Sequence, residues 1–378
     1  MKIAIDASTI STQGGPRSYV LGLLDALLEI DRDNEYVVFY NDPCHKGRFP
    51  KAREIVLPGK NPLARLWREH VLLPRACRRE RIELLHCPKS VIPFFSPGCP
   101  VVVTLHDLIP VKHPELEKRS AQLYWRIHIP WAAKRSDLVI TISEWAKREI
   151  MEEYGVPEDR IAVVMQSFDP VMLEPQDPSA GRSVLVKYGI PPEYILYVGT
   201  IQPRKNLGTL IEAYHRLRLT MNDIPKLVIV GRKGWLYDDL FARIKSLSLE
   251  ESIIFTGFVP DDEIPYLFKG ARLFVYLSLM EGFGRPPLES MASGVPVVTS
   301  NTTAIPEVVG DAGIAVPPTD VDTVAAAIAR ILNDPGYAAV LGQRGRERAR
   351  LFSWEAAARK TLEIYRTVVR DAAQRRVS

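Results

Sequence analysis

The sequence predicts an α/β protein of two doubly wound domains, in which helices cover both faces of a parallel sheet. Short apolar runs rich in Val and Ile alternate with amphipathic segments along most of the chain. The alternation occurs in two series, separated by a stretch rich in Pro, Asp, Ser and Gly. The length of 378 residues also exceeds that of one ordinary domain, so we expect two.

The first series of apolar runs predicts the strands of an N-terminal domain. Near-continuous apolar strands separated by helices are typical of parallel sheets that are buried on both faces. The predicted strands cover residues 2–7, 36–40, 83–88, 101–107, 138–143 and 161–165.

The second series predicts a C-terminal domain after a linker at residues 168–183. Its strands cover residues 194–200, 226–231, 252–257, 273–278, 296–300 and 313–317. A last helical segment begins with Ser353 as its N-cap. We place the domains at 1–172 and 173–352, and expect the helix 353–378 to pack back on the first domain. Ligands bind such sheets at the carboxyl ends of the strands, so we expect the site in a cleft between the domains.

The composition is that of a globular protein without an obvious special partner. Charged residues make up 25% of the chain and hydrophobic residues 46%, and the net charge of +4 gives no case for nucleic acid. The N-terminus lacks a secretory apolar region, and no apolar run is long enough to span a bilayer, so we expect a cytoplasmic protein. The four cysteines form no C-x-x-C pair, which favours reduced thiols over a zinc site.

The stretch EGFGRPPLESMASGVPVVTS, residues 281–300, carries the strongest chemical signal. It follows an apolar strand, turns at two glycines and enters a helix on proline, which suits the first helical turn. The amides of such a turn and the helix dipole make an anion site. Glu281 and Glu289 beside it favour hydroxyl groups on either side of a diphosphate, which is the layout of a nucleotide sugar. The alternative for each glutamate is a helix-end acid favoured by the dipole.

Several motifs together resemble one enzyme family. SLMEGFGRPPLESMASGVPVVTSN and YVGTIQPRKN resemble the donor-binding half of retaining GT-B glycosyltransferases, specifically glycosyltransferase family 4. The resemblance extends to TLHDLIP (104–110), TISEWAKREI (141–150), VGRKGW (230–235) and IPEVVGDAGIAVPPTD (305–320). Within the family, the chain is most similar to bacterial enzymes that add mannose or a related hexose to lipopolysaccharide or exopolysaccharide. The resemblance implies a GT-B fold, in which two Rossmann-like domains face each other across a cleft.

The resemblance assigns roles to residues of the second domain. It implies that Glu281 accepts hydrogen bonds from the donor hexose and that Glu289 accepts them from the ribose. The backbone N–H groups of Gly282, Phe283 and Gly284 are expected to hold the sugar and the diphosphate. Arg204 and Lys205 are expected to neutralise the departing diphosphate, and Arg232, Phe258 and Val259 to frame the base through backbone groups.

The resemblance also assigns residues of the first domain. His106 is expected to point into the cleft near the donor sugar, although a lone histidine is as often structural, and Asp107 is expected to orient a loop or helix start. Gly14 and Gly15 would let the backbone approach the diphosphate or the acceptor. Where many members have an arginine directly after the Val-Gly pair that ends the first strand of the second domain, this chain has Thr200.

The implied chemistry is the transfer of a hexose, of mannose or glucose type, from GDP-mannose or a UDP-hexose to a hydroxyl of a glycan or lipid-linked glycan, with retention of configuration. No cofactor and no metal are expected. The Asp-x-Asp runs at 31–33 and 320–322 are interpreted as surface acids. The sequence leaves open whether the base is guanine or uracil.

Residues 44–89 are locally basic, with twelve Lys or Arg against four Glu. Within them, residues 60–81 mix Leu, Trp67 and Arg at helical spacing, interrupted by Pro74. Such a stretch can lie on an anionic membrane, on the inner face of the cell membrane here. The alternative is a solvated helix whose apolar stripe packs on its own sheet.

Three rival functions stay open at this point. The first is a non-catalytic nucleotide-sugar-binding subunit, which loss of Glu281, Glu289, Arg204 or Lys205 would favour. The second is a sucrose- or glycogen-synthase-type glucosyltransferase that does not bind membranes. The third is a Rossmann oxidoreductase, which a missing third glycine, replaced by Pro287, disfavours.

Overall fold

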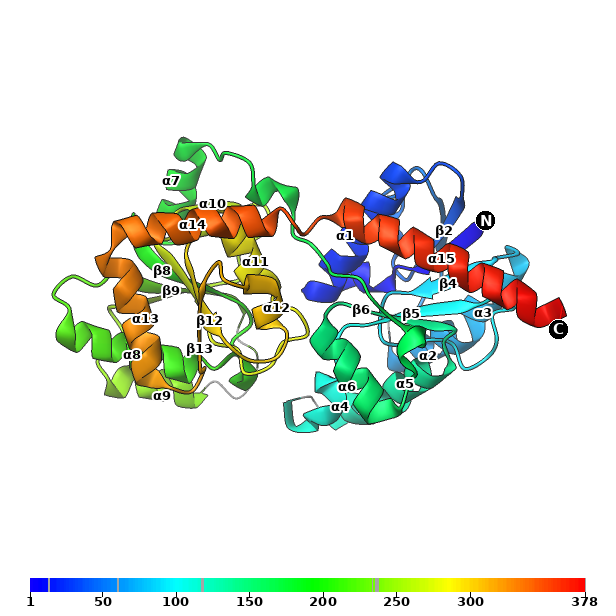
Figure 1. The fold of residues 1–378 in the computed structure, drawn as a ribbon, viewed down its shortest axis with the longest axis horizontal. Coiled ribbons are helices and arrows are strands. Elements are labelled where there is room, and N and C mark those ends of the chain that lie inside the picture. Colours follow the sequence, from blue (N-terminus) through cyan, green and yellow to red (C-terminus); the bar gives the residue numbers. More distant parts are fainter. Residues whose placement is uncertain (13, 60, 117–118, 233, 235–237, 378) are drawn as a thin grey trace. The chain divides into compact units, whose positions relative to one another are not determined.

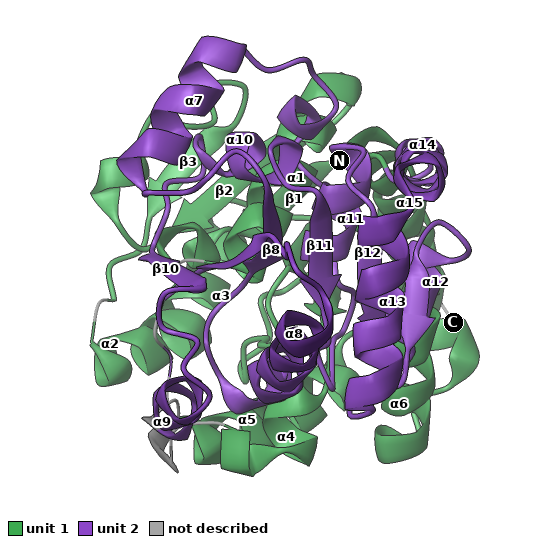
Figure 2. Ribbon diagram, turned by 90° about the vertical axis from the view of Figure 1, so that its left-hand side faces the viewer, with its two compact units in different colours: residues 1–167, 353–378 green, residues 168–352 purple. Residues whose placement is uncertain are grey.

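The computed structural model describes residues 1–12, 14–59, 61–116, 119–232, 234 and 238–377. They form two compact units (Figure 2), one of residues 1–167 with 353–378 and one of residues 168–352. The division lies five residues before the position at which the sequence analysis places it.

Unit 1 is built on a parallel sheet that has seven strands within the described residues, in the order β3-β2-β1-β4-β5-β6-β7. The strands are β1 (Lys2–Asp6), β2 (Glu35–Tyr40), β3 (Arg53–Val56), β4 (Leu84–Cys87), β5 (Val101–Leu105), β6 (Leu138–Thr141) and β7 (Ile161–Val163). The helices are α1 (Gly15–Ile30), α2 (Pro62–Trp67), α3 (Leu73–Arg79), α4 (Ile109–Lys112), α5 (Arg119–Arg135), α6 (Glu144–Tyr154) and α15 (Trp354–Val377). Helices α1 and α15 cover one face of the sheet, and α5 and α6 the other (Figure 1).

Unit 2 has a parallel sheet of six strands among its described residues, in the order β10-β9-β8-β11-β12-β13. The strands are β8 (Tyr194–Val198), β9 (Lys226–Val230), β10 (Ile253–Gly257), β11 (Leu273–Tyr276), β12 (Val297–Ser300) and β13 (Ile314–Val316). The helices are α7 (Pro178–Lys187), α8 (Leu207–Thr220), α9 (Asp238–Ser246), α10 (Ile264–Lys269), α11 (Arg285–Ala292), α12 (Ile305–Val309), α13 (Val321–Asn333) and α14 (Pro335–Ala349). Helices α8 and α13 pack together on one face, and α11 and α14 on the other (Figure 1).

The twelve predicted strands are all present, and the sequence analysis missed one. The missed strand, β3, lies at the edge of the sheet beside β2, and its residues Arg53 and Glu54 interrupt the apolar pattern. The predicted linker at 168–183 is partly wrong, because α7 begins within it. Asp177 caps that helix by accepting from Ser179 N–H, and Pro178 occupies its first turn, a start signal that the composition of the segment obscured.

Both sheets reverse their strand order at one point. In unit 1 this switch point lies between β1 and β4, and in unit 2 between β8 and β11. Loops that leave adjacent strands in opposite directions open a crevice at their carboxyl ends, where ligands of such sheets bind. We therefore expect the functional residues of each unit at its switch point.

Helix α15 belongs to unit 1 because its aromatic residues bury against that unit. Ser353 caps it, as predicted, by accepting from Ala356 N–H (3.0 Å). Trp354 packs over Gly22 of α1 so closely that a Cβ there would lie 2.2 Å from the indole. Tyr365 is fully buried, and its hydroxyl lies 2.6 Å from Nδ1 of His86 on β4. The chain thus returns to its first unit after completing the second.

Within the basic segment 60–81, residues 62–79 form a helix with an irregular centre, and Lys60 lies outside the described residues. A π-helical turn, Arg68–Leu72, separates α2 from α3, and in it the N–H of Leu73 donates to the carbonyl of Arg68. Pro74 follows directly and has no N–H to donate. Arg68, Glu69 and His70 are all buried, so the segment is not a simple amphipathic surface helix. None of the helices in the described part of the chain is both long and apolar enough for a membrane span.

Candidate active site

Two loops meet at the switch point of unit 2. One follows β8 and contains the single 3₁₀ turn Pro203–Lys205, and the other follows β11 and contains Glu281. The N–H of Leu279 donates to the carbonyl of Arg204 (2.8 Å), so the backbones of the two loops are joined. This hydrogen bond brings the residues of the two loops close to one another.

Glu281 is the centre of a polar cluster. Arg204 Nη1 donates to its Oε1 (3.0 Å), and the hydroxyls of Tyr276 (2.8 Å) and Ser278 (2.7 Å) contact the same oxygen. Lys205 Nζ also binds Oε1 and lies 2.6 Å from the Tyr276 hydroxyl. All the side-chain contacts found for Glu281 within the described part of the chain thus end on Oε1, and none is found for Oε2.

The charges of this cluster decide the ionisation of Glu281. Burial disfavours its charged form, but Lys205 and Arg204 outweigh burial and lower the pKa of Glu281 to about 2. Burial, with the Glu281 charge as the next cause, raises the pKa of the Tyr276 hydroxyl well above its ordinary value. Two cations beside one carboxylate leave an excess of positive charge, which suits an anionic ligand such as a diphosphate.

The glycine turn after Glu281 leads into α11. Gly284 has φ +100°, which favours glycine, and a Cβ there would press on Ile305 (3.3 Å). Two of the first three residues of α11 are prolines, so its first turn offers fewer N–H groups than an ordinary helix. The predicted anion-binding amides of Gly282 and Phe283 therefore belong to the turn rather than to the helix.

Glu289 has a partner that the sequence analysis did not name. Its side chain is buried, and its Oε1 accepts from Arg285 Nε (2.7 Å) one helical turn earlier. Burial raises the pKa of Glu289 although Arg285 opposes the shift. The spacing of four residues in α11 was the available signal for this pair.

The residues expected to frame a base lie just after two neighbouring strands of unit 2. Arg232 follows β9 and Phe258 follows β10, and the guanidinium stacks 4.2 Å from the centre of the half-exposed ring. Val259 is buried beside them. Lys233 and Trp235 of the VGRKGW motif lie outside the described residues.

His106 follows β5 in unit 1 and is held by two contacts. Its Nε2–H donates to the carbonyl of Pro88 (3.4 Å), and its ring packs edge-on against Tyr19 at 4.8 Å. Burial lowers the pKa of His106 to about 4, although the Pro88 carbonyl opposes the shift, so the imidazole is neutral at pH 7. Asp107 accepts from Ile109 N–H (3.1 Å) at the start of α4, which is the orienting role expected of it.

Gly14 and Gly15 begin α1 in the loop that follows β1. Gly14 is the N-cap with φ 97°, a conformation that favours glycine. A Cβ at either position would meet no atom within 4 Å, so the space above this turn is open to a ligand.

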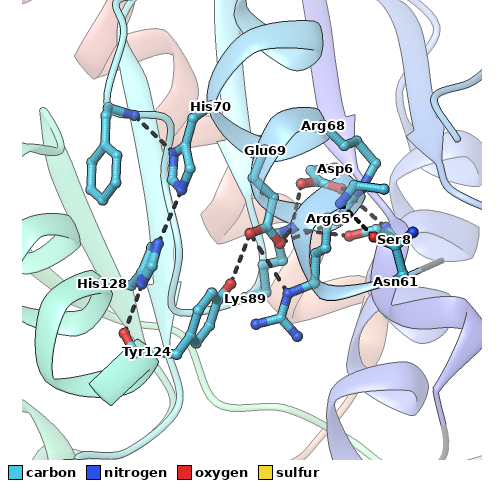
Figure 3. Close-up of polar contacts among 12 residues, drawn as sticks. Asp6, Ser8, Asn61, Arg65, Arg68, Glu69, His70, Lys89, Tyr124 and His128 are labelled. Carbon is cyan, nitrogen blue, oxygen red and sulfur yellow. Dashed lines mark hydrogen bonds and ion pairs between the residues drawn. The ribbon is translucent and has the colours of Figure 1, made fainter. Parts of the chain in front are cut away.

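The switch point of unit 1 holds a second charged cluster, which the sequence analysis missed. Asp6 ends β1, and Lys89, two residues after β4, lies 2.8 Å from its Oδ2 (Figure 3). Lys89 also binds Glu69 (2.8 Å) and Ser8 (3.1 Å), and Arg68 pairs with Asp6 (3.4 Å). The signal was the acid at the end of the apolar run KIAID, where a polar residue is costly unless it is paired.

The Asp-x-Asp runs do not assemble a cation site. Asp320 caps α13 by accepting from the N–H groups of Asp322 and Thr323. Asp31 is buried and accepts from Tyr36 and Asn34, so its interpretation as a surface acid was wrong. Among the described residues, no group of three or more His, Cys, Asp or Glu could hold a metal ion.

Comparisons with known proteins identify the family to which the chain belongs. The family described as Glycosyl transferases group 1 matches residues 186–348, and the family Glycosyltransferase Family 4 matches residues 13–170. O-antigen chain mannosyltransferase B of Escherichia coli is 36% identical over 266 residues, which are 70% of each chain. The chain belongs to glycosyltransferase family 4.

One further relative is much longer than this glycosyltransferase, while two solved structures match it over almost its whole length. The serotype-specific mannosyltransferase WbdA of Escherichia coli is 30% identical over 72% of this chain, which spans only 34% of that protein. The solved structure of Anabaena HepE with UDP-glucose superposes with a TM-score of 0.76 at 20% identity, covering 97% of this chain and all of that one. WaaG, a glycosyltransferase involved in lipopolysaccharide biosynthesis, superposes with a TM-score of 0.74 at 16% identity, over 96% and 99% of the two chains. The two superpositions show that the fold is GT-B.

The predicted site residues of this glycosyltransferase fall into separate groups in the structure. Arg204, Lys205 and Glu281 form one contact network. Glu289 pairs with Arg285 instead, and Arg232 stacks on Phe258. His106, Gly14 and Gly15 belong to unit 1. Tyr276 and Ser278, which complete the Glu281 cluster, were not predicted, because a tyrosine at the end of an apolar strand has the pattern of a core residue.

Proposed function

We propose that this glycosyltransferase is a retaining, metal-independent hexosyltransferase. It moves a hexose of the mannose or glucose type from GDP-mannose or a UDP-hexose to a hydroxyl group of a glycan or lipid-linked glycan. The product contributes to a polysaccharide or lipopolysaccharide. The observation that carries the proposal is the Glu281 cluster, where two cations and one carboxylate meet at the switch point of unit 2.

The relatives support the choice of substrate class. Two of those named above are mannosyltransferases, one of them acting on the O-antigen chain. The Anabaena structure contains UDP-glucose. These statements concern those proteins, and the transfer of a hexose from a nucleotide sugar by this chain is our proposal.

The cluster performs two tasks in the proposed reaction. Arg204 and Lys205 stabilise the negative charge that builds on the leaving diphosphate as the bond to the hexose breaks. Glu281 accepts hydrogen bonds from hexose hydroxyls on Oε2, because Oε1 already binds its protein partners. Catalysis is then mainly positioning and electrostatic stabilisation, with the acceptor attacking the face from which the diphosphate departs.

The remaining residues bind the nucleotide. Glu289 accepts from the ribose hydroxyls, and the amides of Gly282, Phe283 and Gly284 hold the diphosphate. Arg232, Phe258 and Val259 frame the base. We also propose that the enzyme is cytoplasmic and meets a lipid-linked acceptor at an anionic membrane surface.

Thermal unfolding with UDP or GDP, each with and without EDTA, tests the donor site. A nucleotide at about 100 times its dissociation constant stabilises the protein by about 2.7 kcal/mol. We expect a rise in melting temperature with one of the two nucleotides, unchanged by EDTA. The rise shrinks in Glu289→Gln and persists in Glu251→Ala, an exposed carboxylate of the same unit. No rise with either nucleotide would contradict the proposal.

The stereochemistry has its own readout. Once a donor is identified, NMR of the product should show the anomeric configuration of the donor sugar in the new linkage. An inverted linkage would contradict the retaining mechanism and leave the donor site intact.

A further inference from the structure

Unit 1 exposes an unusual set of apolar side chains. They come from three segments, residues 61–79, 88–98 and 121–135, which together we call the aromatic–basic surface. The exposed apolar residues are Leu63 (79%), Trp67 (55%), Phe94 (38%), Phe95 (62%), Leu123 (66%) and Ile127 (47%). Isolated exposed apolar residues are normal, but several from adjoining segments mark an interaction site.

Ring and side-chain contacts show that the three segments adjoin. The Phe94 ring stacks on His70 of the first segment (3.9 Å between centroids) and on His128 of the third (5.2 Å). Trp131 of the third segment donates to the carbonyl of Pro93 (3.3 Å). Arg78 of the first segment donates to the carbonyl of Ser96. The second segment therefore lies against both helical segments.

A directed chain of hydrogen bonds holds these segments in place. The N–H of Phe94 donates to His70 Nδ1 (3.2 Å), so the ring proton of His70 sits on Nε2 and points at His128 Nε2, 3.0 Å away (Figure 3). His128 Nδ1–H in turn donates to the carbonyl of Tyr124 (2.7 Å). Both histidines are satisfied only in the neutral form, and burial lowers the pKa of each.

The charged cluster at the switch point anchors the same segments. Glu69 of the π-helical turn binds Lys89 of the second segment and accepts from the Tyr124 hydroxyl (2.8 Å) of the third (Figure 3). Buried charges are costly unless they are paired, so these contacts favour the arrangement in which the three segments adjoin. The exposed side chains therefore extend from segments that buried polar contacts join.

The charge of the surface is one-sided. The three segments contain nine Lys or Arg and a single carboxylate, Glu69. That carboxylate is buried and paired with Arg68 and Lys89. The cations that reach solvent are Arg65, Arg75, Arg78, Arg79, Arg126, Lys134 and Arg135. Within the described part of these segments no acid is exposed beside them.

We propose that the aromatic–basic surface docks onto a bilayer that contains anionic lipids. Apolar and aromatic side chains enter the boundary between headgroups and acyl chains, while the surrounding arginines bind lipid phosphates. The one-sided positive charge favours this occupant over a second copy of the chain, which would bring the same charge against itself. The contact comprises residues 61–79 together with loop 88–98 and residues 121–135 of α5.

The proposal rests on the membrane contact given under the proposed function and names the surface that makes it, and its test does not depend on the donor reaction. Sedimentation with vesicles of phosphatidylglycerol and phosphatidylethanolamine is compared with vesicles of phosphatidylcholine. We expect the protein to bind the anionic vesicles, with binding that weakens as salt is raised. The variant Trp67→Ser/Phe95→Ser should bind about tenfold more weakly, because two large apolar side chains no longer enter the bilayer.

Matched controls separate this effect from loss of fold. Leu219→Ser/Leu351→Ser removes two side chains of similar exposure (72% and 74%) from unit 2 and should bind vesicles as the parent does. The charge variant Arg75→Glu/Arg126→Glu should lose most of the salt-sensitive binding. All variants should keep their circular dichroism and the nucleotide-induced shift in melting temperature.

Four outcomes would overturn the proposal. They are no binding of the parent to anionic vesicles, equal binding to phosphatidylcholine, unchanged binding of Trp67→Ser/Phe95→Ser, and dissociation of a dimer in that variant during size-exclusion chromatography. The last would assign the surface to contact between copies. None of them bears on whether the second unit binds a nucleotide sugar.

Discussion

At the scale of single residues, the function of the candidate site depends on how Glu281 is held. Its Oε1 is shared by two cations and two hydroxyls, so the orientation of the carboxylate depends in part on hydroxyls that do not themselves carry the proposed chemistry. Tyr276 is the most informative of these, because its hydroxyl contacts both Lys205 and Glu281. It is a positioning residue in the proposed mechanism.

We expect Tyr276→Phe to lower kcat/KM about tenfold, because the loss of one hydrogen bond in a polar network costs about 1.5 kcal/mol. Steady-state kinetics measures the loss. The matched control is Tyr214→Phe, which removes a buried hydroxyl bonded to the carbonyls of Pro225 and Ser252. Both variants should be destabilised to a similar degree in urea, but only Tyr276→Phe should lose activity. Equal kinetics in the two variants would remove Tyr276 from the mechanism.

The sequence motifs and the family resemblance located part of this site. Glu281, Arg204 and Lys205 were predicted because their motifs place unusual chemistry beside apolar strands, and the structure joins them in one network. Tyr276, Ser278 and Arg285 were not predicted. A strand-end tyrosine or serine has the same sequence signature whether it faces the core or a charged cluster.

At the scale of elements, local signals set most boundaries, while packing decided which elements touch. Ser353 begins α15 and Asp177 begins α7 through side-chain caps that are visible in the sequence. The π-helical turn at Arg68–Leu72 has no such signal beyond the nearby Pro74. This turn orients side chains, because three consecutive polar residues in it are buried.

The space around two helical glycines, one crowded and one open, predicts different effects of substitution by alanine. Gly22→Ala should destabilise unit 1 by about 1–3 kcal/mol, because its Cβ would overlap Trp354 and separate the helices. Gly208→Ala in α8 has open space around its Cβ and should be neutral or stabilising by up to about 1 kcal/mol. Chemical denaturation of both variants measures the pair. A Gly22→Ala protein as stable as Gly208→Ala would show that the two helices are not tightly packed.

At the scale of the whole molecule, the chain closes on itself through His86 and Tyr365, which are 279 residues apart in sequence. Burial, with a smaller contribution from His106, lowers the pKa of His86 to about 3. The folded protein therefore takes up this proton at a lower pH than the unfolded chain does. Stability is full above the unfolded pKa near 6.5 and is lost as pH falls from there toward 3.

We expect this histidine to cost the protein about 2 kcal/mol of unfolding free energy between pH 7 and pH 5. His86→Gln cannot take up the proton, so the stability difference between parent and variant should shrink by that amount over this interval. Urea unfolding at several pH values provides the measurement. Parallel curves for the two proteins would show that His86 is not held neutral in the folded state.

The sequence by itself determined the two series of parallel strands, the helix caps and the family, because apolar runs, capping residues and glycine turns act on neighbours along the chain. Only the tertiary structure decided which polar residues share a site. The Glu281 cluster joins loops 76 residues apart, and the Asp6 cluster joins residues up to 83 positions apart. Those contacts depend on the order of strands in each sheet. Uniformly apolar strands do not encode that order locally, because any of them can pair with any other until the helices and connections are packed.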